Sequence, residues 1–163
     1  MVRDEAGSVR ACAKQLQPYS SVGARCLGTV QAMRTSEHLT PGQTYSRKQL
    51  MEAFKIGDST INNGIFRPAG HDSVWIFITQ DKTADRTQYV DVYTGDVLNF
   101  EGQNRGRTDD LIREHRERGL ELLLFFRKKK DERPDYSFCF EGVFEYVSSE
   151  SGPPTRFRLL RRA

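Results

Sequence analysis

The sequence has too few cysteines, and spaces them too widely, for a disulfide framework or a paired zinc site. Cys12, Cys26 and Cys139 are odd in number and far apart, whereas both kinds of site need cysteines in pairs at short spacings. The chain also lacks an apolar run long enough to span a bilayer, and its first residues include Asp4 and Glu5 instead of the apolar stretch of a signal peptide. We therefore expect a soluble protein of the reducing cytoplasm with no membrane partner.

The common catalytic and nucleotide-binding motifs are absent as well. The chain contains no Gly-x-Ser-x-Gly turn, no phosphate loop ending in Gly-Lys and no Rossmann glycine fingerprint. His38 and His71 have no cysteine, histidine or carboxylate at metal-ligand spacing. His115 falls on the apolar face of an expected helix, which favours a partly buried, hydrogen-bonded side chain. We expect no cofactor, no metal site and no catalytic residue in this chain.

One enzymatic alternative stays open. Asp96 and Glu101, with Gln103 two residues further on, are similar in spacing to the Asp…Glu-x-Lys arrangement that holds Mg²⁺ in many DNA-cutting enzymes, although the lysine is missing. Glu101 could equally pair with Arg105 or Arg107. A Mg²⁺-dependent nuclease is one alternative function, and a non-catalytic protein-interaction domain is another.

What the chain does have is charge and aromatic bulk. Its 163 residues suit one cored domain with an extra arm, and 10% aromatic side chains are enough for a small dense core. The net charge of +3 is mild. Basic residues nevertheless cluster at Arg105 to Arg107, at Arg127 to Lys130 and at Arg156 to Arg162. These clusters either contact phosphates or are solvated loop and terminal charges.

The chain divides by pattern into an arm and a domain. Residues 1–43 keep no helical or strand period, so we expect an N-terminal arm or linker there and a domain over residues 44–163. A helix is predicted over 47–54, because Ser46 and Gln49 have the spacing of a capping box.

A second short turn, capped by Asp58 or Ser59, would carry Ile61 inward. The segment from Tyr45 to Ile61 could be a helix-turn-helix DNA reader, but Asn62-Asn63-Gly64 ends its second helix early. A structural helix pair is therefore favoured.

From Ile65 onward the period falls to two, which is typical of strands. One helix, over 109–118, is expected between them, with Thr108 as its cap and Gly119 as its end. The apolar run 120–126 predicts a strand covered on both faces, and Gly142 predicts a bulge or bend. The strands are expected over 73–79, 88–93, 97–100, 120–127, 136–146 and 156–160. The predicted fold class is α+β: a small, strongly bent, mostly antiparallel β-barrel with one or two packed helices.

Aromatic, amide and basic side chains occur in segments that would be neighbours in such a barrel. Two or three rings could sandwich a nucleobase, amides could recognise its edge, and basic residues could bind flanking phosphates. The predicted base pocket consists of Asn63, Phe66, Trp75, Asp85, Tyr89, Asn99, Phe100 and Gln103. The predicted contacts to the DNA backbone are Arg67, Arg86, Arg105, Arg107, Arg127, Lys128, Lys129 and Lys130.

The same segments carry a family resemblance. They are Asn63-Gly64-Ile65-Phe66-Arg67-Pro68, Trp75-Ile76-Phe77-Ile78-Thr79, Asp85-Arg86-Thr87-Gln88-Tyr89, the run from Gly95 to Gln103, and Arg107-Thr108-Asp109 followed by Leu111-Ile112 and Glu114-His115. Together, over roughly residues 44 to 162, the chain resembles a bacterial domain of unknown function. That domain occurs at the ends of helicase-like proteins and beside HNH nuclease domains in restriction systems.

This family is similar to the PUA-like superfamily, which includes the SET and RING associated (SRA) domains that flip a modified base into an aromatic pocket. The resemblance implies a pseudo-barrel that reads modified DNA for a restriction or DNA-processing protein, whose nuclease or helicase domain would be its partner. Where related members have His-Trp, this chain has Asn99-Phe100. The position of the pocket is therefore carried over from the family, and the identity of its ligand is not.

Overall fold

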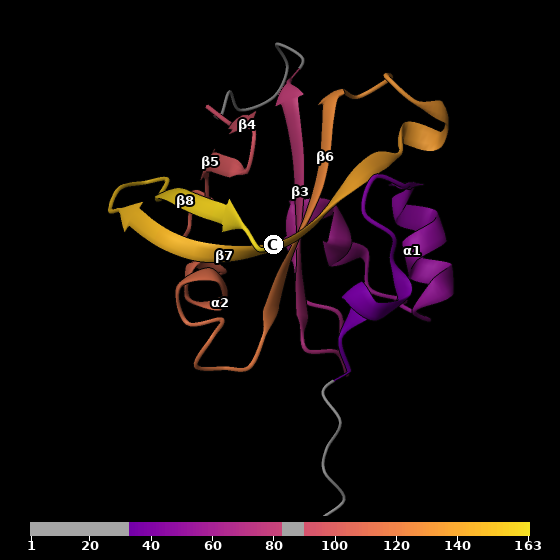
Figure 1. The fold of residues 1–163 in the computed structure, drawn as a ribbon, viewed down its shortest axis with the longest axis horizontal. Helices are drawn as coiled ribbons and strands as arrows, with labels where there is room; N and C mark the ends of the chain where they lie inside the picture. The colour runs from indigo at the N-terminus through magenta and orange to yellow at the C-terminus, as the bar shows by residue number, and fades with distance from the viewer. Residues whose placement is uncertain (1–32, 83–89) are drawn as a thin grey trace, which may run out of the picture. The chain divides into compact units, whose positions relative to one another are not determined.

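The computed structural model describes residues 33–82 and 90–163, which fall in one compact unit, Ala32–Ala163. Within this described part the fold is α+β, with two α-helices and one mixed eight-stranded sheet (Figure 1). None of the helices there is long and apolar enough to cross a membrane. With η for a 3-10 helix, the elements are η1 (Thr35–His38), β1 (Thr44–Tyr45), α1 (Arg47–Ala53), η2 (Ser59–Asn63), β2 (Ile65–Phe66), β3 (Ser73–Asp81), β4 (Val92–Thr94), β5 (Val97–Glu101), α2 (Asp109–Arg113), β6 (Glu121–Lys129), η3 (Pro134–Tyr136), β7 (Phe138–Glu150) and β8 (Arg156–Arg161).

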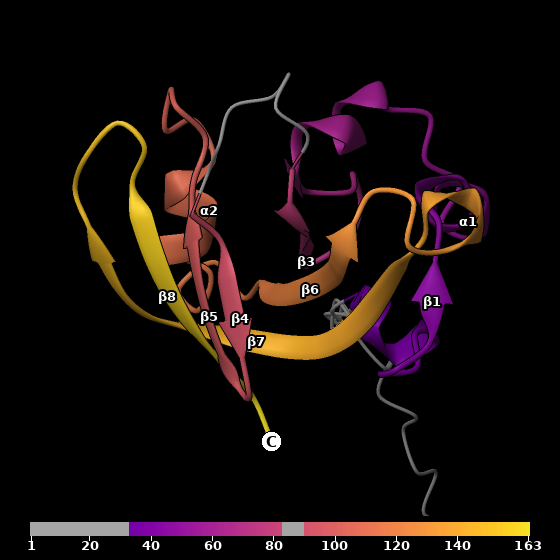
Figure 2. The ribbon, with the colours of Figure 1, turned by 90° about the horizontal axis from the view of Figure 1, so that it is seen from above.

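The sheet is bent but not closed. Its strand order is β2-β3-β6-β7-β8-β5-β4, with β1 paired to β7. All pairs of described strands are antiparallel except β3 and β6, which run parallel. Figure 2 shows β7 sweeping from β6 round to β8, so that β8, β5 and β4 turn back towards β3. The bend and the mostly antiparallel pairing agree with the prediction, but β2 and β4 remain edges, so the sheet does not form a closed barrel.

The long strand β7 makes the bend. Its first half, from Cys139 to Phe144, pairs with β6, and its second half pairs with β8. The register with β6 shifts opposite Leu124 and Phe125, where Gly142 takes a φ of 109°. An extra residue at such a bulge bends and twists a strand, which confirms the predicted role of Gly142.

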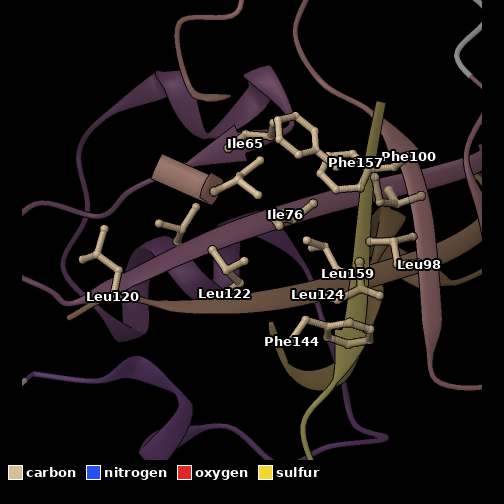
Figure 3. Packing of buried hydrophobic residues seen from close by; sticks show 13 residues of the cluster. Ile65, Ile76, Leu98, Phe100, Leu120, Leu122, Leu124, Phe144, Phe157 and Leu159 are labelled. Carbon is tan, nitrogen blue, oxygen red and sulfur yellow. The ribbon is translucent and has the colours of Figure 1, made fainter. Parts of the chain in front are cut away.

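The central strands are covered on both faces, as the apolar run 120–126 predicted. On β3 and β6 the side chains alternate, so Ile76 and Leu124 enter one core, while Trp75 and Phe125 enter another. The first core packs against α2, β5 and β8; Figure 3 shows Phe100 and Phe157 side by side within it. The second core is covered by η1, α1 and η2, which supply Leu39, Leu50 and Ile61.

The first helix begins and ends close to where the sequence predicted. The Ser46 hydroxyl accepts a hydrogen bond from the Gln49 amide (3.2 Å), and the Gln49 side chain accepts one from the Ser46 amide (2.8 Å). This is the expected capping box. Asp58 accepts from the Thr60 amide (2.8 Å) and caps η2. Because η2 is a five-residue 3-10 helix that ends before Gly64, it is too short to be a recognition helix.

The predicted helix over 109–118 is shorter than expected. Helix α2 ends at Arg113, and turns continue to Gly119, whose φ is 65°. Thr108 stands at the N-cap position, as predicted, but its side chain makes no capping hydrogen bond. The first amides of the helix are instead satisfied by the preceding turn, because the Asp109 amide donates to the Gly106 carbonyl (3.2 Å).

Residues 33–43, predicted to belong to the arm, hydrogen-bond to the sheet. The Trp75 indole donates to the Thr35 hydroxyl (2.9 Å). The Glu121 carboxylate accepts from the Ser36 amide (3.0 Å) and the Ser73 hydroxyl (2.6 Å). These contacts hold η1 against β3 and β6. The division of the chain at residue 44 stays a prediction, because residues 1–32 lie outside the described part.

Candidate functional site

A cleft of about 670 Å³ lies where the bent sheet fails to close. One wall is formed by η2 and the end of β3, and the facing wall by the end of β5 and the residues after it. Basic side chains from α1 and from the end of β6 complete its border. The lining residues are Arg47, Asn62, Asn63, Gly64, Ile65, Phe77, Ile78, Thr79, Asp81, Lys82, Asp91, Phe100, Glu101, Gly102, Gln103, Arg127 and Lys130.

The cleft exists because β2 covers only part of the β3 edge. β2 pairs with β3 at Trp75 and Ile76, and the Phe77 amide donates to the Gly64 carbonyl (2.7 Å). The chain turns away at Gly64, which needs its left-handed φ of 88°. Along a strand, the backbone N–H and C=O groups of successive residues point alternately to one edge and to the other. Those of Thr79 therefore point to the same edge of β3 as those of Phe77. A backbone donor and acceptor therefore face the cleft.

The Gln103 side chain joins the two walls, and other amide side chains lie beside it. The Gln103 side chain donates to the Asn63 carbonyl (3.3 Å) across the cleft. The Asn62 side chain donates to the Ser59 carbonyl (3.1 Å) within η2. The Asn63 side chain and the Gln103 amide oxygen make no hydrogen bond to any other described residue, so both are available to a ligand.

The basic border is held by aromatic rings. The guanidinium of Arg127 lies 4.0 Å from the Phe138 ring centroid, and its Nε donates to the Thr79 hydroxyl (2.9 Å). The Arg47 guanidinium lies over Phe77, 4.7 Å from the ring centroid. Cation–π contacts of this kind fix the direction of a charge. The cleft is therefore bordered by cations of defined orientation.

An ion pair joins the two walls at the end of β3. Lys82 Nζ lies 2.6 Å from Asp91 Oδ2, and Asp91 Oδ1 accepts from the Glu101 amide (3.1 Å). Because Asp91 is buried, this pair links the β3 end to β5 through bonds that little water can replace.

The predicted cage aromatics lie in the cores. Trp75 is 0% exposed and belongs, with Phe66, to the core under α1. Phe100 belongs to the other core, where it stacks on Phe157 with ring centroids 5.4 Å apart. Strand alternation sends these rings to opposite faces of the sheet. They enclose no common space, and only Phe100 reaches the cleft.

The other predicted site residues divide into three groups. Asn63, Gln103, Arg127 and Lys130 are brought together, with Phe100, at the cleft. Asp85, Arg86 and Tyr89 lie outside the described residues. The remaining ones are exposed and do not line the cleft: Arg67, Asn99, Arg105, Arg107, Lys128 and Lys129.

Asn99 lies on the outer face of β5, paired with Arg158 of β8. It therefore points away from its neighbour Phe100. Arg105 and Arg107 follow Gln103 in the turn after the cleft wall, and neither makes an ion pair with another described residue.

Sequence reasoning missed Arg47, Thr79, Lys82 and Asp91. Thr79 ends the predicted strand 73–79 and Lys82 comes directly after β3, so a search of strand ends would have included both. Arg47 carries no such signal, since it is one polar residue in the first turn of a helix.

The two carboxylates of the nuclease alternative are far apart. Asp96 precedes β5 and Glu101 ends it, a separation of about 16 Å along an extended strand. Each also lies near an arginine: Arg161 Nε is 3.7 Å from Asp96, and Arg156 Nε is 3.3 Å from Glu101. Among the described residues, no three His, Cys, Asp or Glu side chains are grouped as for a metal ion. The geometry therefore does not favour this alternative.

Comparisons with known proteins give limited guidance. No protein-family model matches the chain, and no curated protein matches it. Among solved structures, a "Modification dependent TagI restriction endonuclease" is similar with a TM-score of 0.45 and 19% identity over 76% of this chain. The similar region is 50% of that protein, so the chain spans about half of its length.

Proposed function

We propose that this chain is a DNA-binding module that holds one nucleotide with a modified base in the cleft between β3 and β5, without catalysis of its own. One observation carries the proposal: a cleft of about 670 Å³ has amide groups on its two facing walls and basic side chains along its border. Sites for small ligands fall in this size range. A flat polar base and a charged phosphate need these two kinds of group.

Each part of the cleft has a role in this proposal. The Asn63 and Gln103 amides and the backbone of Thr79 would recognise the edge of the base. Arg47, Arg127 and Lys130 would bind the phosphates on either side of it. The turn that carries Arg105 and Arg107 would extend this contact along the strand.

A PUA-like or SRA-like origin of the fold is part of the proposal, supported by the bent, mostly antiparallel sheet. So is a role in a cytoplasmic restriction or DNA-processing protein, in which an HNH nuclease or helicase domain would be the partner. The base pocket differs from the aromatic cage first expected, because the amides and the β3 edge, instead of Trp75, would contact the base.

The first test compares duplexes that differ only in modification. Fluorescence anisotropy at low salt would use matched oligonucleotides that are unmodified, cytosine-methylated, hydroxymethylated or adenine-methylated. We expect one of them to bind tighter than the unmodified duplex, and Gln103→Ala to reduce that preference about 5- to 150-fold, because one base contact carries about 1–3 kcal/mol. Arg158→Ala, on the outer face of β8, should keep the preference.

Absence of binding to any duplex at low salt would contradict the proposal and favour a protein-interaction domain, since phosphate contacts are strongest there. Cleavage of plasmid DNA by the pure chain in Mg²⁺ would contradict its non-catalytic part.

The second test measures salt dependence. Lys130→Ala should weaken binding to modified and unmodified duplexes alike, and should lower the slope of log K against log salt by about 0.9, the value for one lost phosphate contact. An unchanged slope would show that Lys130 is a solvated charge. Arg158→Ala is again the control and should leave the slope unchanged.

A further inference from the structure

Tyr136 is the single exposed aromatic residue in ranges 33–82 and 90–163. The residue is 59% exposed, whereas every Phe, Trp and other Tyr in those ranges is buried or half-buried. Exposed aromatic rings are where nucleic-acid-binding proteins stack bases. Tyr136 belongs to η3, between the basic end of β6 and β7.

The backbone holds Tyr136 in an unusual conformation. Asp135 and Tyr136 are consecutive residues with φ of 55° and 54°. The left-handed region is uncommon for a bulky residue, and such positions persist only where the surroundings hold them. Here the Tyr136 carbonyl accepts from Arg127 Nη1 (2.5 Å), and the Ser137 hydroxyl donates to the Pro134 carbonyl (2.6 Å). The loop therefore presents the ring through hydrogen bonds of its backbone.

Two residues connect Tyr136 to the cleft. Arg127 and Lys130 both line the cleft. Arg127 holds the Tyr136 carbonyl, and Lys130 Nζ lies 5.5 Å from the centroid of the Tyr136 ring. The ring is thus one side chain away from the cleft, next to a lysine that could contact a phosphate.

We infer that Tyr136 is a stacking platform for an unpaired base of the DNA strand that enters the cleft. This inference rests on the proposed function. The flat ring would stack on the base beside the held nucleotide, while Lys130 would bind the phosphate between them. Stacking of this kind tolerates any base, because every base has a π-face. The contact would contribute affinity, whereas the cleft would supply the preference for the modification.

The test uses a duplex with one 2-aminopurine placed opposite an abasic site, because stacking quenches the fluorescence of this base analogue. Tyr136→Phe should bind and quench as the unaltered chain does. Tyr136→Ala and Tyr136→Leu should bind about 5- to 100-fold more weakly, the loss expected from one stacked base, and should lose the quenching. Leu160→Ala, which removes an exposed apolar side chain of β8, is the matched control and should change neither quantity.

The outcomes separate the two proposals. If the unaltered chain binds the duplex, and Tyr136→Leu binds it with the same affinity and the same quenching, the stacking role is overturned. The cleft proposal then stands. A lower salt slope in Tyr136→Leu would also overturn the stacking role, because the tyrosine would then act by placing Lys130. No binding by the unaltered chain would contradict the cleft proposal itself. Thermal unfolding of each variant identifies any loss that comes from the fold.

Discussion

Gly102 lies where the cleft wall meets the core, and its surroundings leave no room for a side chain. A Cβ at this position would lie 2.9 Å from Phe157 Cε2 and 3.0 Å from Asp109 Oδ1. The buried Asp109 in turn accepts a hydrogen bond from the Thr155 hydroxyl (2.6 Å), and the Gly102 amide donates to the Thr155 carbonyl (2.8 Å). This close packing sets the position of Gln103, the next residue.

Gly102→Ala should lower the free energy of unfolding by about 1–3 kcal/mol, because an added methyl group overpacks a filled site. Gly57→Ala is the control, since a Cβ there meets no atom within 4 Å and the residue has no left-handed φ. Urea denaturation would measure both variants. Equal stability of Gly102→Ala and the unaltered chain would show that the loop moves aside, and its DNA affinity should then change as well.

Helix α1 shows how local sequence specifies an element and its place. The capping box at Ser46 starts the helix, and Leu50 then lies in the core beneath it. The strands were predictable for a similar reason, since alternation of apolar residues is a local signal. Helix α2 ends earlier than predicted because the turns after Arg113 lead the chain towards β6. There the Leu120 amide donates to the His115 carbonyl (2.7 Å).

Ser46→Ala should lower the free energy of unfolding by about 1 kcal/mol, the usual cost of an N-cap serine. The Ser46→Ala, Gln49→Ala double variant should lose less than the sum of the single variants, since each side chain bonds to the other's backbone amide. Chemical denaturation of the four proteins gives this coupling. Additive losses would contradict a working capping box.

The molecule as a whole depends on the covering of both sheet faces, and the titratable side chain of His115 is buried by that packing. Its Nδ1 lies 2.8 Å from the Ile112 carbonyl, so Nδ1 carries the proton of the neutral ring. Burial lowers the pKa of His115 below its ordinary 6.5, and the nearby Arg116 acts in the same direction. The unfolded chain therefore binds this proton more readily than the folded one.

The free energy of unfolding should accordingly fall as the pH drops from about 7.5 to 5.5, because over this window the unfolded chain binds a proton at His115 more readily than the folded chain does. His115→Gln keeps a donor for the Ile112 carbonyl and removes the titration, so its stability should depend less on pH over this window. Urea unfolding at several pH values tests this. The same pH dependence in both proteins would assign it to other groups.

Local patterns in the sequence were enough to predict the α+β class, most strands, the first helix with its cap and the buried run 120–126. They also pointed to Asn63, Gln103, Arg127 and Lys130, since amides and cations near strand ends are candidates on chemical grounds alone. They could not decide which aromatics are accessible. That depends on which face of a strand each ring occupies and what covers that face.

Long-range packing made those decisions. Helix α1 and the η1 segment cover Trp75, while the open β3 edge and the η3 loop expose a cleft and Tyr136. Two residues forty positions apart, Asn63 and Gln103, lie together at the cleft only because the sheet bends through β7 and stops short of closing. Gly142 indicated where a strand bends, but no local pattern indicated which strands pair with the two halves of β7, because those strands are distant in the chain.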